Sequence, residues 1–215
     1  MTKAILATRP EHDDTTHYLS SWCAKALHAA RNKGITVFDL RRERAQREPL
    51  ASILSKKQPE LILLCGHGSD TAVCGHKDIP LIEAGVNEQL LRRTITFTIS
   101  CRSARTLGPI CVEKGARSFV GYDDDFVFFY DKHKITAPLE DGTAALFLEP
   151  PYELALALVK GNSVGESHRR SQEHFLRNME TLLSSEAGAD EAALARYLWW
   201  DRSHQVFHGD GSAAF

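Results

Sequence analysis

Two residues that can do covalent chemistry stand near the ends of two short apolar segments. His67 comes late in residues 61–68, and Cys101 closes residues 94–101. A cysteine nucleophile needs a neighbouring group that moves protons, and imidazole is a common one. If the two segments are neighbouring parallel strands, both residues lie at the carboxyl edge of a sheet, where α/β proteins bind ligands. The sequence therefore predicts that His67 and Cys101 face one crevice.

The glycines around His67 favour a functional role over a structural one. A cysteine at a strand end is more often a small buried hydrophobic residue than a nucleophile. His67, however, lies between Gly66 and Gly68. Glycine lets another backbone approach closely and adopts torsions that other residues avoid. A core histidine is seldom presented in this way, so the pair together indicates a catalytic cysteine and its histidine partner.

The elements that must position this pair alternate between strand and helix patterns. Apolar, β-branched segments predict strands, and amphipathic segments with capping residues predict helices. The predicted strands are residues 4–8, 35–40, 61–68, 94–101 and 117–122, and the predicted helices are residues 14–32, 49–57, 82–93 and 103–114. Residues 69–80 are expected to form a loop or small hairpin over the crevice. The alternation predicts an α/β fold whose mostly parallel sheet is covered by helices on both faces.

The pattern changes in the second half of the chain. An acidic turn at residues 123–125 is followed by an aromatic run that is either a strand or the wall of a pocket. Helices are predicted at residues 142–160 with a break at Pro150 and Pro151, at residues 164–183 and at residues 189–199, before a last edge strand at residues 205–210. We expect a single domain over residues 1–215, with an alternating core at 1–122 and a pocket loop, C-terminal helices and last strand at 123–215.

The composition is that of a globular protein in a reducing compartment. The chain has 215 residues, is 43% hydrophobic and carries a formal charge of −2, so its net charge attracts neither nucleic acid nor an anionic membrane. Five cysteines, an odd number, argue against a disulfide framework. Residues 1–8 are too short and too polar for a signal peptide. We therefore expect a cytoplasmic protein without nucleic-acid or membrane partners.

The order of these motifs resembles the caspase-like (clan CD) cysteine peptidases. His67-Gly68 follows one apolar strand and Cys101 the next, as in the bacterial CHAT-type, gingipain-like and metacaspase-like proteases. The resemblance covers residues 61–122 and extends weakly to His208-Gly209-Asp210 near the end of the chain. It implies a three-layer caspase-like (caspase–hemoglobinase) fold. Only Cys101-Arg102 is kept from the caspase signature, and the histidine lies closer than the roughly 50 residues upstream of that signature, so substrate preference cannot be copied from caspases.

The resemblance also implies a mechanism and a class of substrate. Cys101 would attack a peptide carbonyl, His67 would pass protons to the leaving amine and from water, and the amides of Gly68 and Cys101 would bind the oxyanion. A helix starting just after Cys101 would favour the thiolate. The partner would be a protein or peptide substrate, with a second protein as a candidate activator. Small members of this superfamily often act in bacterial defence or regulated cell death.

Acidic residues near the predicted nucleophile suggest which side chain the substrate offers. Asp123, Asp124 and Asp125 end the strand beside the one that carries Cys101, where this superfamily lines its substrate pocket together with residues such as Ser100. Carboxylates at this position would favour cleavage after Arg or Lys. The alternatives are an exposed acidic turn without a role or a metal-dependent loop. Alternatively, Arg102 and Arg105 would bind an acidic side chain of the substrate.

Three alternative functions remain open from the sequence. Cys65, His67, Cys74 and His76 include four side chains of the types that ligate zinc, although their spacing is unlike the usual zinc pairs. The chain could be a catalytically silent member of the superfamily that serves as a binding or scaffold module. It could also be a flavodoxin-like protein with a ligand in the same crevice, but phosphate-binding motifs are absent. We expect no cofactor and no metal.

Overall fold

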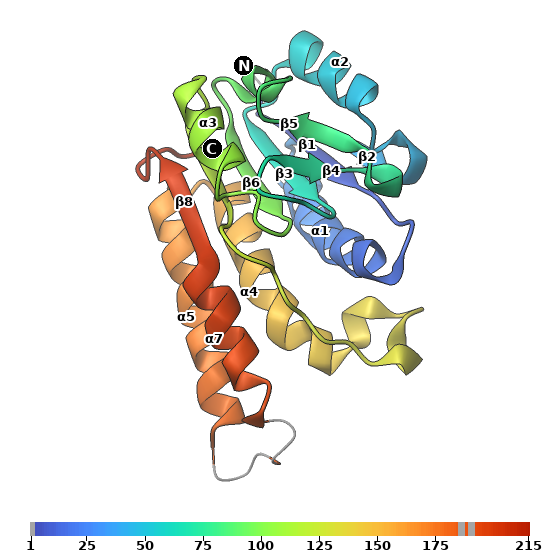
Figure 1. Ribbon diagram of the computed structural model, residues 1–215, viewed down its shortest axis with the longest axis vertical. Helices are drawn as coiled ribbons and strands as arrows, with labels where there is room; N and C mark the ends of the chain where they lie inside the picture. Colours follow the sequence, from blue (N-terminus) through green and yellow to red (C-terminus); the bar gives the residue numbers. More distant parts are fainter. Residues whose placement is uncertain (1–2, 185–187, 189–191) are drawn as a thin grey trace.

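A sheet of six strands forms the middle layer of the protein (Figure 1). The computed structural model describes residues 3–184, 188 and 192–215. The strands of the sheet are β1 Ala4–Arg9, β2 Thr36–Arg41, β3 Leu61–Cys65, β6 Ile95–Ile99, β7 Ser118–Tyr122 and β8 Gln205–Gly209. Their order is β2-β1-β3-β6-β7-β8, and every pair is parallel except β7 and β8. The predicted mostly parallel sheet with a last edge strand is confirmed.

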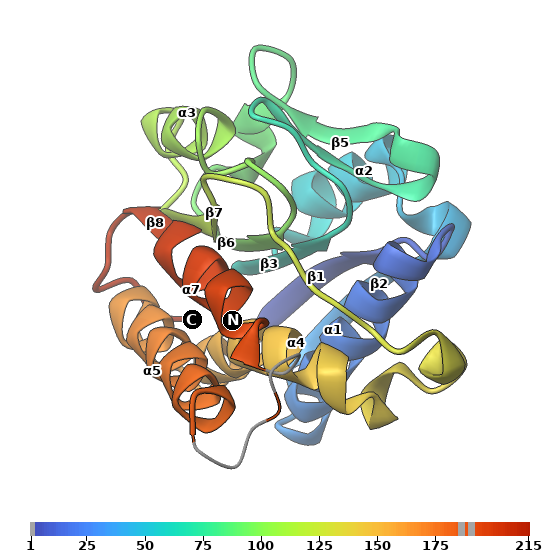
Figure 2. The ribbon, with the colours of Figure 1, turned by 60° about the horizontal axis from the view of Figure 1, so that its bottom comes forward.

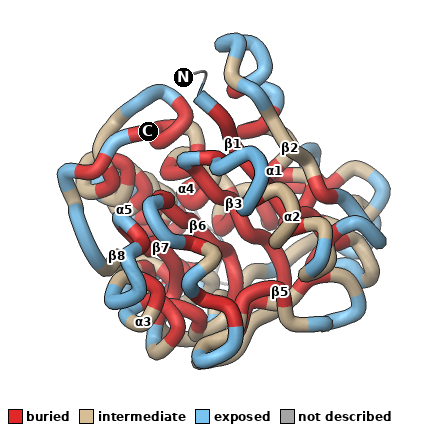
Figure 3. The backbone as a smooth tube through the Cα atoms, turned by 90° about the horizontal axis from the view of Figure 1, so that it is seen from above, coloured by how far each residue is buried: buried red, intermediate tan, exposed pale blue. Residues whose placement is uncertain are grey.

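Alternate side chains of the central strands enter opposite cores, as the pleat of a strand requires. On β1, Ile5 and Ala7 pack into one core and Leu6 into the other. On β3 the same alternation separates Leu63 from Ile62. Both faces of these strands are therefore buried, which explains why their sequences are continuously apolar. Figure 3 shows the buried strands in the middle and the exposed loops around them.

Helices cover both faces of the sheet and add a further layer on one side (Figures 1 and 2). The helices are α1 Asp14–Asn32, α2 Arg47–Lys57, α3 Leu107–Glu113, α4 Gly142–Val159, α5 Val164–Leu182 and α7 Ala195–His204. Helices α1 and α4 pack on one face, and α2 and α3 pack on the other. Helix α5 packs against α4 and α7, and these three share a separate apolar cluster. The three-layer α/β fold with additional C-terminal helices is confirmed.

The predicted hairpin over the crevice is present, but a predicted helix beside it is not. Strands β4 (Ala72–Cys74) and β5 (Pro80–Glu83) pair antiparallel in a separate two-stranded sheet. The prediction of a helix over residues 82–93 is wrong, because this stretch holds the end of β5 and a short 3-10 turn, Glu88–Leu91. Gly85, at φ +77°, turns the chain between them. Apolar residues that the sequence spaces as if on a helix are divided between a strand and a turn.

The proline pair inside α4 does not break the helix, contrary to the sequence prediction. Pro150 cannot donate to the carbonyl of Leu146, four residues earlier. The side chain of Asn178 on α5 donates to that carbonyl instead, at 2.7 Å. Helix α4 therefore runs through Pro150 and Pro151 without interruption.

The remaining segments differ in smaller ways from the predictions. Residues 126–130 form neither a strand nor a helix. The predicted helix over residues 189–199 starts outside the described residues, and α7 begins at Ala195. Further 3-10 turns occupy Arg42–Arg44, His76–Asp78, Lys132–Lys134 and Pro138–Glu140. In the described part of the chain, every helix is too short or too polar to cross a membrane.

Candidate active site

The ends of β3 and β6 bring His67 and Cys101 to the same edge of the sheet. Cys65 and Ile99 are paired in the parallel ladder, and the amide of Gly66 donates to the carbonyl of Ile99 at 3.3 Å. His67 and Cys101 each lie two residues beyond this last pair. They therefore flank one point at the carboxyl edge of the sheet, as the spacing of the two motifs predicts.

Gly68 lies directly against the turn that carries Cys101. A Cβ atom at position 68 would stand 2.7 Å from the carbonyl oxygen of Cys101 and 2.8 Å from Cβ of Ser100. Gly68 also lies opposite Val73 of the hairpin. The hydrogen bonds of this pairing come from the adjacent residues: the amide of Cys74 donates to the carbonyl of His67, and the amide of Ser69 donates to the carbonyl of Ala72. The amide of Gly68 is thus left out of the ladder. The position and the amide suit the predicted oxyanion role, which stays a prediction.

Asp13 is a partner of His67 that sequence reasoning missed. Its Oδ2 atom lies 2.7 Å from Nε2 of His67. A carboxylate at Nε2 fixes the ring and leaves Nδ1 as the basic nitrogen. Asp13 follows β1, and β1 pairs with β3, so the loop after β1 must lie beside His67. That strand order was the missing signal, because Asp13 alone resembles only a helix cap.

The pKa of Asp13 lies below its usual value, so its carboxylate stays charged beside the imidazole. Burial pushes this pKa up, but hydrogen bonds from the backbone of Thr16 and from His67 outweigh burial. A charged carboxylate also stabilises the imidazolium that forms when His67 takes a proton. The arrangement is therefore suited to a histidine that gains and loses a proton during a reaction.

Cys101 is partly buried, and its environment favours the thiol. Burial raises the pKa of Cys101, and the negative charge of Asp125 raises it further. The thiol lies 3.8 Å from the carbonyl oxygen of Phe126, to which it can donate. Residues 125 and 126 thus form one wall beside the sulfur. Such a thiol needs a base to become a nucleophile, and the candidate base is His67.

The expected helix immediately after Cys101 is absent, which corrects the prediction of a thiolate favoured by a helix N-terminus. Residues 101–106 are turns, and α3 begins only at Leu107. Arg102 takes a left-handed conformation at φ +57°. Strained backbone of this kind is frequent at functional sites. The tight turn, rather than a helix dipole, determines how Cys101 is presented.

The three acidic residues after β7 have different surroundings. Asp123 binds Nδ1 of His204 at 2.7 Å, in a surface depression that His208 also lines. Asp124 forms an ion pair with Arg105 at 2.9 Å. Asp125 pairs with Arg102 at 3.0 Å and is the acid whose charge acts on Cys101. Asp125 is therefore the one of the three whose charge reaches Cys101, and the pocket role of all three stays a prediction.

A second acidic residue outside the predicted set joins this charge cluster. Asp70, in the loop after Gly68, lies 3.7 Å from Arg102 and 3.6 Å from Arg105. Three carboxylates, Asp70 and those at positions 124 and 125, thus face two guanidinium groups. The cluster has an excess of one negative charge, which favours a cationic ligand beside Cys101.

Ser100 supports the turn that carries Cys101, and its place among the pocket residues stays a prediction. Its side chain is buried, and its hydroxyl lies 2.6 Å from that of Thr98 and 2.8 Å from that of Ser103. These hydrogen bonds join the end of β6 to the turn after it. Ser100 thus helps to hold the backbone of the Cys101 turn against Gly68.

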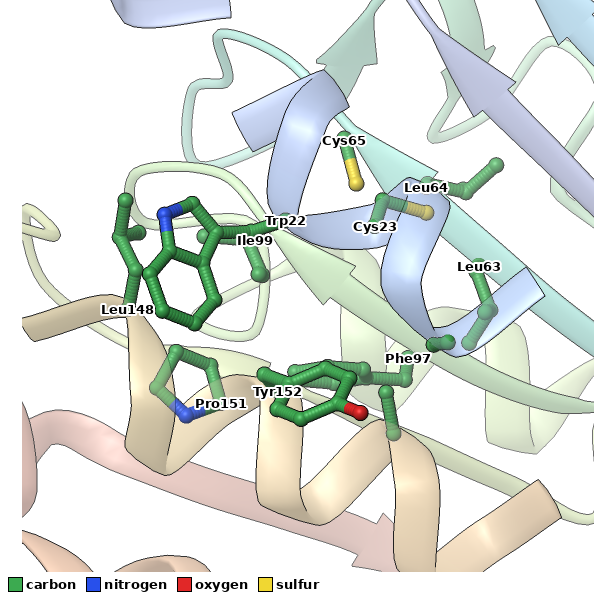
Figure 4. Close-up of a pocket in the computed structure, with 12 residues that line it drawn as sticks. Trp22, Cys23, Leu63, Leu64, Cys65, Phe97, Ile99, Leu148, Pro151 and Tyr152 are labelled. Carbon is green, nitrogen blue, oxygen red and sulfur yellow. The ribbon is translucent and has the colours of Figure 1, made fainter. Parts of the chain in front are cut away.

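The alternative zinc site is not formed in the described part of the chain, because its four side chains do not come together as one group; these are Cys65, His67, Cys74 and His76. Cys65 is buried, and the thiol of Cys23 together with burial raises its pKa well above the usual value. Figure 4 shows Cys65 and Cys23 beside each other in an apolar pocket between α1, the sheet and α4. Among the described residues, the groups close enough to share an ion are instead His12, His67 and Asp78.

Two solved structures share the fold of this chain. The Arg specific cysteine proteinase gingipain R (RGPB) matches with a TM-score of 0.61 and 11% sequence identity over 99% of this chain. The complex of Porphyromonas gingivalis RgpB pro- and mature domains matches with a TM-score of 0.60 and 10% identity over 98% of this chain. The chain has a caspase-like fold. No protein-family model and no curated protein matches the sequence.

The caspase-like fold is shown by geometry and not by sequence, because both identities are low. The chain spans about half of each matched structure, 47% of its length. The likeness extends over almost the whole of this chain, including the C-terminal helices and last strand that the motif resemblance reached only weakly. The fold implied by His67-Gly68 and Cys101 is therefore confirmed.

Proposed function

We propose that the protein is a cysteine endopeptidase in which Cys101 is the nucleophile, His67 the general acid and base, and Asp13 the group that orients His67. The observation that carries this proposal is the Asp13–His67 contact at 2.7 Å, on a histidine two residues past the strand that pairs with the strand leading to Cys101. A histidine with a purely structural role would lie in the core, whereas His67 lies at the open edge of the sheet and has a charged carboxylate as its partner. The caspase-like fold of two cysteine proteinases supports the same reaction class.

The proposed reaction proceeds in two steps. His67 takes the proton of the Cys101 thiol as the sulfur attacks the carbonyl carbon of the substrate, and the amides of Gly68 and Cys101 donate to the oxyanion. The tetrahedral intermediate collapses to a thioester when the protonated His67 gives its proton to the leaving amine. His67 then removes a proton from water, which hydrolyses the thioester and restores the thiol.

We further propose that the enzyme cleaves after Arg or Lys. The excess negative charge of the cluster around Asp125 favours a basic side chain beside Cys101. A substrate guanidinium could replace Arg102 at the carboxylate of Asp125 and form a bidentate pair there. The solved neighbour that is described as Arg specific supports this preference.

Fluorogenic peptides ending in Arg, Lys or Asp test both parts of the proposal. We expect hydrolysis after Arg or Lys by the wild type and loss of hydrolysis in Cys101→Ala. Hydrolysis after Asp would keep the Cys101 nucleophile and contradict the basic specificity. If no peptide is cut, labelling of Cys101 by a peptidyl electrophile distinguishes a latent enzyme from a catalytically silent binding module, which would leave the thiol unlabelled.

Control by another polypeptide fits the proposed peptidase. A solved neighbour is a complex between pro- and mature domains. The raised pKa of Cys101 leaves the free protein with little thiolate, so that binding at the site could activate it. We propose that an activating protein or segment acts at this edge of the sheet, in the setting of bacterial defence or regulated cell death. Co-expression with neighbouring gene products, followed by the peptide assay, tests it.

A further inference from the structure

A group of metal-binding side chains surrounds His67 on the side of the β1–α1 loop. One nitrogen each of His12 and His67 and a carboxylate oxygen of Asp78 all lie within 4.8 Å of one another. The ring of His12 packs edge-on against that of His67, with centroids 6.1 Å apart. Nε2 of His12 lies 3.1 Å from Oδ1 of Asp78. The group brings together the loop after β1, the end of β3 and the turn between β4 and β5.

The environment of His12 suits a ligand better than a structural contact. The side chain of His12 is only 13% exposed. Its Nε2 atom points at two carboxylates, Asp78 at 3.1 Å and Asp13 at 3.6 Å. In the described part of the chain, its Nδ1 atom is buried without a hydrogen-bond partner. A buried nitrogen without a partner costs folding free energy, so His12 is not placed here for the hydrogen bonds of its ring alone, and the two carboxylates that face its Nε2 atom would attract a cation.

We propose that His12, His67 and Asp78 bind a Zn²⁺ ion that switches off the peptidase by occupying His67. Two imidazoles and a carboxylate form a ligand set that suits zinc, whereas calcium and magnesium prefer oxygen ligands alone. Tetrahedral zinc with bonds of about 2.0–2.1 Å needs donors about 3.3 Å apart. His12 and Asp78 already lie close to this spacing at 3.1 Å, and all three donor atoms lie within 4.8 Å of one another, so small side-chain rotations can bring them to a shared ion. The two carboxylates at positions 13 and 78 would balance the charge of the ion.

The inhibitory consequence rests on the proposed function, but the zinc site itself does not. Zinc binds the neutral imidazole through a ring nitrogen lone pair. His67 with a metal on one nitrogen can no longer both accept and return the proton of Cys101, and it is drawn away from Asp13. The thiols take no part in the proposed site, since Cys65 is buried against Cys23 and none of the cysteines belongs to the group.

Isothermal titration calorimetry with ZnCl₂ tests the site without any measurement of activity. We expect one Zn²⁺ per chain in the wild type, and binding weaker by at least about tenfold in His12→Ala and Asp78→Asn. His28, exposed on α1 and outside the group, supplies the matched control: His28→Ala should bind like the wild type. Cys101→Ala should also retain binding. Magnesium chloride in place of zinc should give no binding heat.

Each outcome of this titration decides the proposal. Absence of zinc binding in the wild type, or equal binding in Asp78→Asn, overturns the site, and loss of binding in Cys101→Ala overturns it in favour of a thiolate site. The inhibitory effect is measured as the ratio of peptidase activity with Zn²⁺ to activity without it, within each variant. Because Asp78→Asn should bind zinc more weakly, zinc should inhibit it less, and its ratio should lie closer to one than that of the wild type. A protein that binds zinc as expected but cleaves no peptide would refute the proposed function and leave the zinc site standing.

Discussion

Asp13 holds the start of α1 with one carboxylate oxygen and His67 with the other. Its Oδ1 atom accepts the backbone N–H of Thr16 at 2.7 Å, while its Oδ2 atom lies 2.7 Å from Nε2 of His67. The hydroxyl of Thr16 accepts the amide of Asp13 in return, which completes a capping box. The cap fixes the carboxylate, and the carboxylate fixes the imidazole. Helix α1 thus positions the candidate base without contributing a residue of its own to the reaction.

Substitution of Asp13 should separate its two roles. Asn caps helices about as well as Asp, so Asp13→Asn should keep the melting temperature. Its uncharged amide cannot stabilise the imidazolium and can impose the wrong tautomer, so kcat/KM should fall at least about tenfold. Thr16→Ala is the control, because it should cost about 1 kcal/mol of stability and keep activity well below the melting temperature. Full kcat/KM in Asp13→Asn would contradict the orienting role.

The titration of Cys101 should respond to Asp125. Burial and the charge of Asp125 both raise the pKa of Cys101, so its alkylation by iodoacetamide should be slow at neutral pH and accelerate as the pH rises. Asp125→Asn removes the charge and frees Arg102, so the midpoint should move to lower pH. Mass spectrometry of the peptide that contains Cys101 gives the rate. Asp124→Asn, whose carboxylate faces Arg105, should leave the midpoint in place, and an unchanged midpoint in Asp125→Asn would refute the assignment.

The sequence predicted what depends on local pattern and missed what depends on strand order. Alternating strands and helices, and the residues that end β3 and β6, follow from periodicity that is visible along the chain. Asp13 lies far from His67 in sequence and reaches it only because β1 pairs with β3. The ion pairs of Asp125 and Asp70 likewise depend on where loops from different strands meet. The helix break at Pro150 was predicted wrongly because Asn178, on another helix, satisfies the carbonyl that proline leaves free.

Replacement of Gly68 should damage both the fold and the site. In Gly68→Ala the new methyl group would meet the carbonyl of Cys101 at 2.7 Å and Cβ of Ser100 at 2.8 Å. Both neighbours belong to the tight turn at the end of β6, whose hydrogen bonds keep it from yielding easily, so the expected loss of stability is about 1–3 kcal/mol. Urea denaturation measures it, and the residual folded protein should hydrolyse peptides poorly. Gly142→Ala, where a Cβ would meet nothing within 4 Å, should be neutral or slightly stabilising. Equal stability of the two variants would contradict the close contact.

Acid should destabilise the protein through the loop that carries Asp13. Burial alone would raise the pKa of Glu11, but hydrogen bonds from Arg41, Ser20 and Arg42 outweigh it and lower the pKa to about 2, from 4.5. The unfolded chain therefore binds the proton more tightly, so this contribution to stability is complete above about pH 4.5 and is lost as the pH falls towards 2. Glu11→Gln should lower the melting temperature at pH 7 and weaken its decline between pH 5 and 2. Glu180→Gln, exposed on α5, should change neither. A decline as steep in Glu11→Gln as in the wild type would mean that other carboxylates govern acid unfolding.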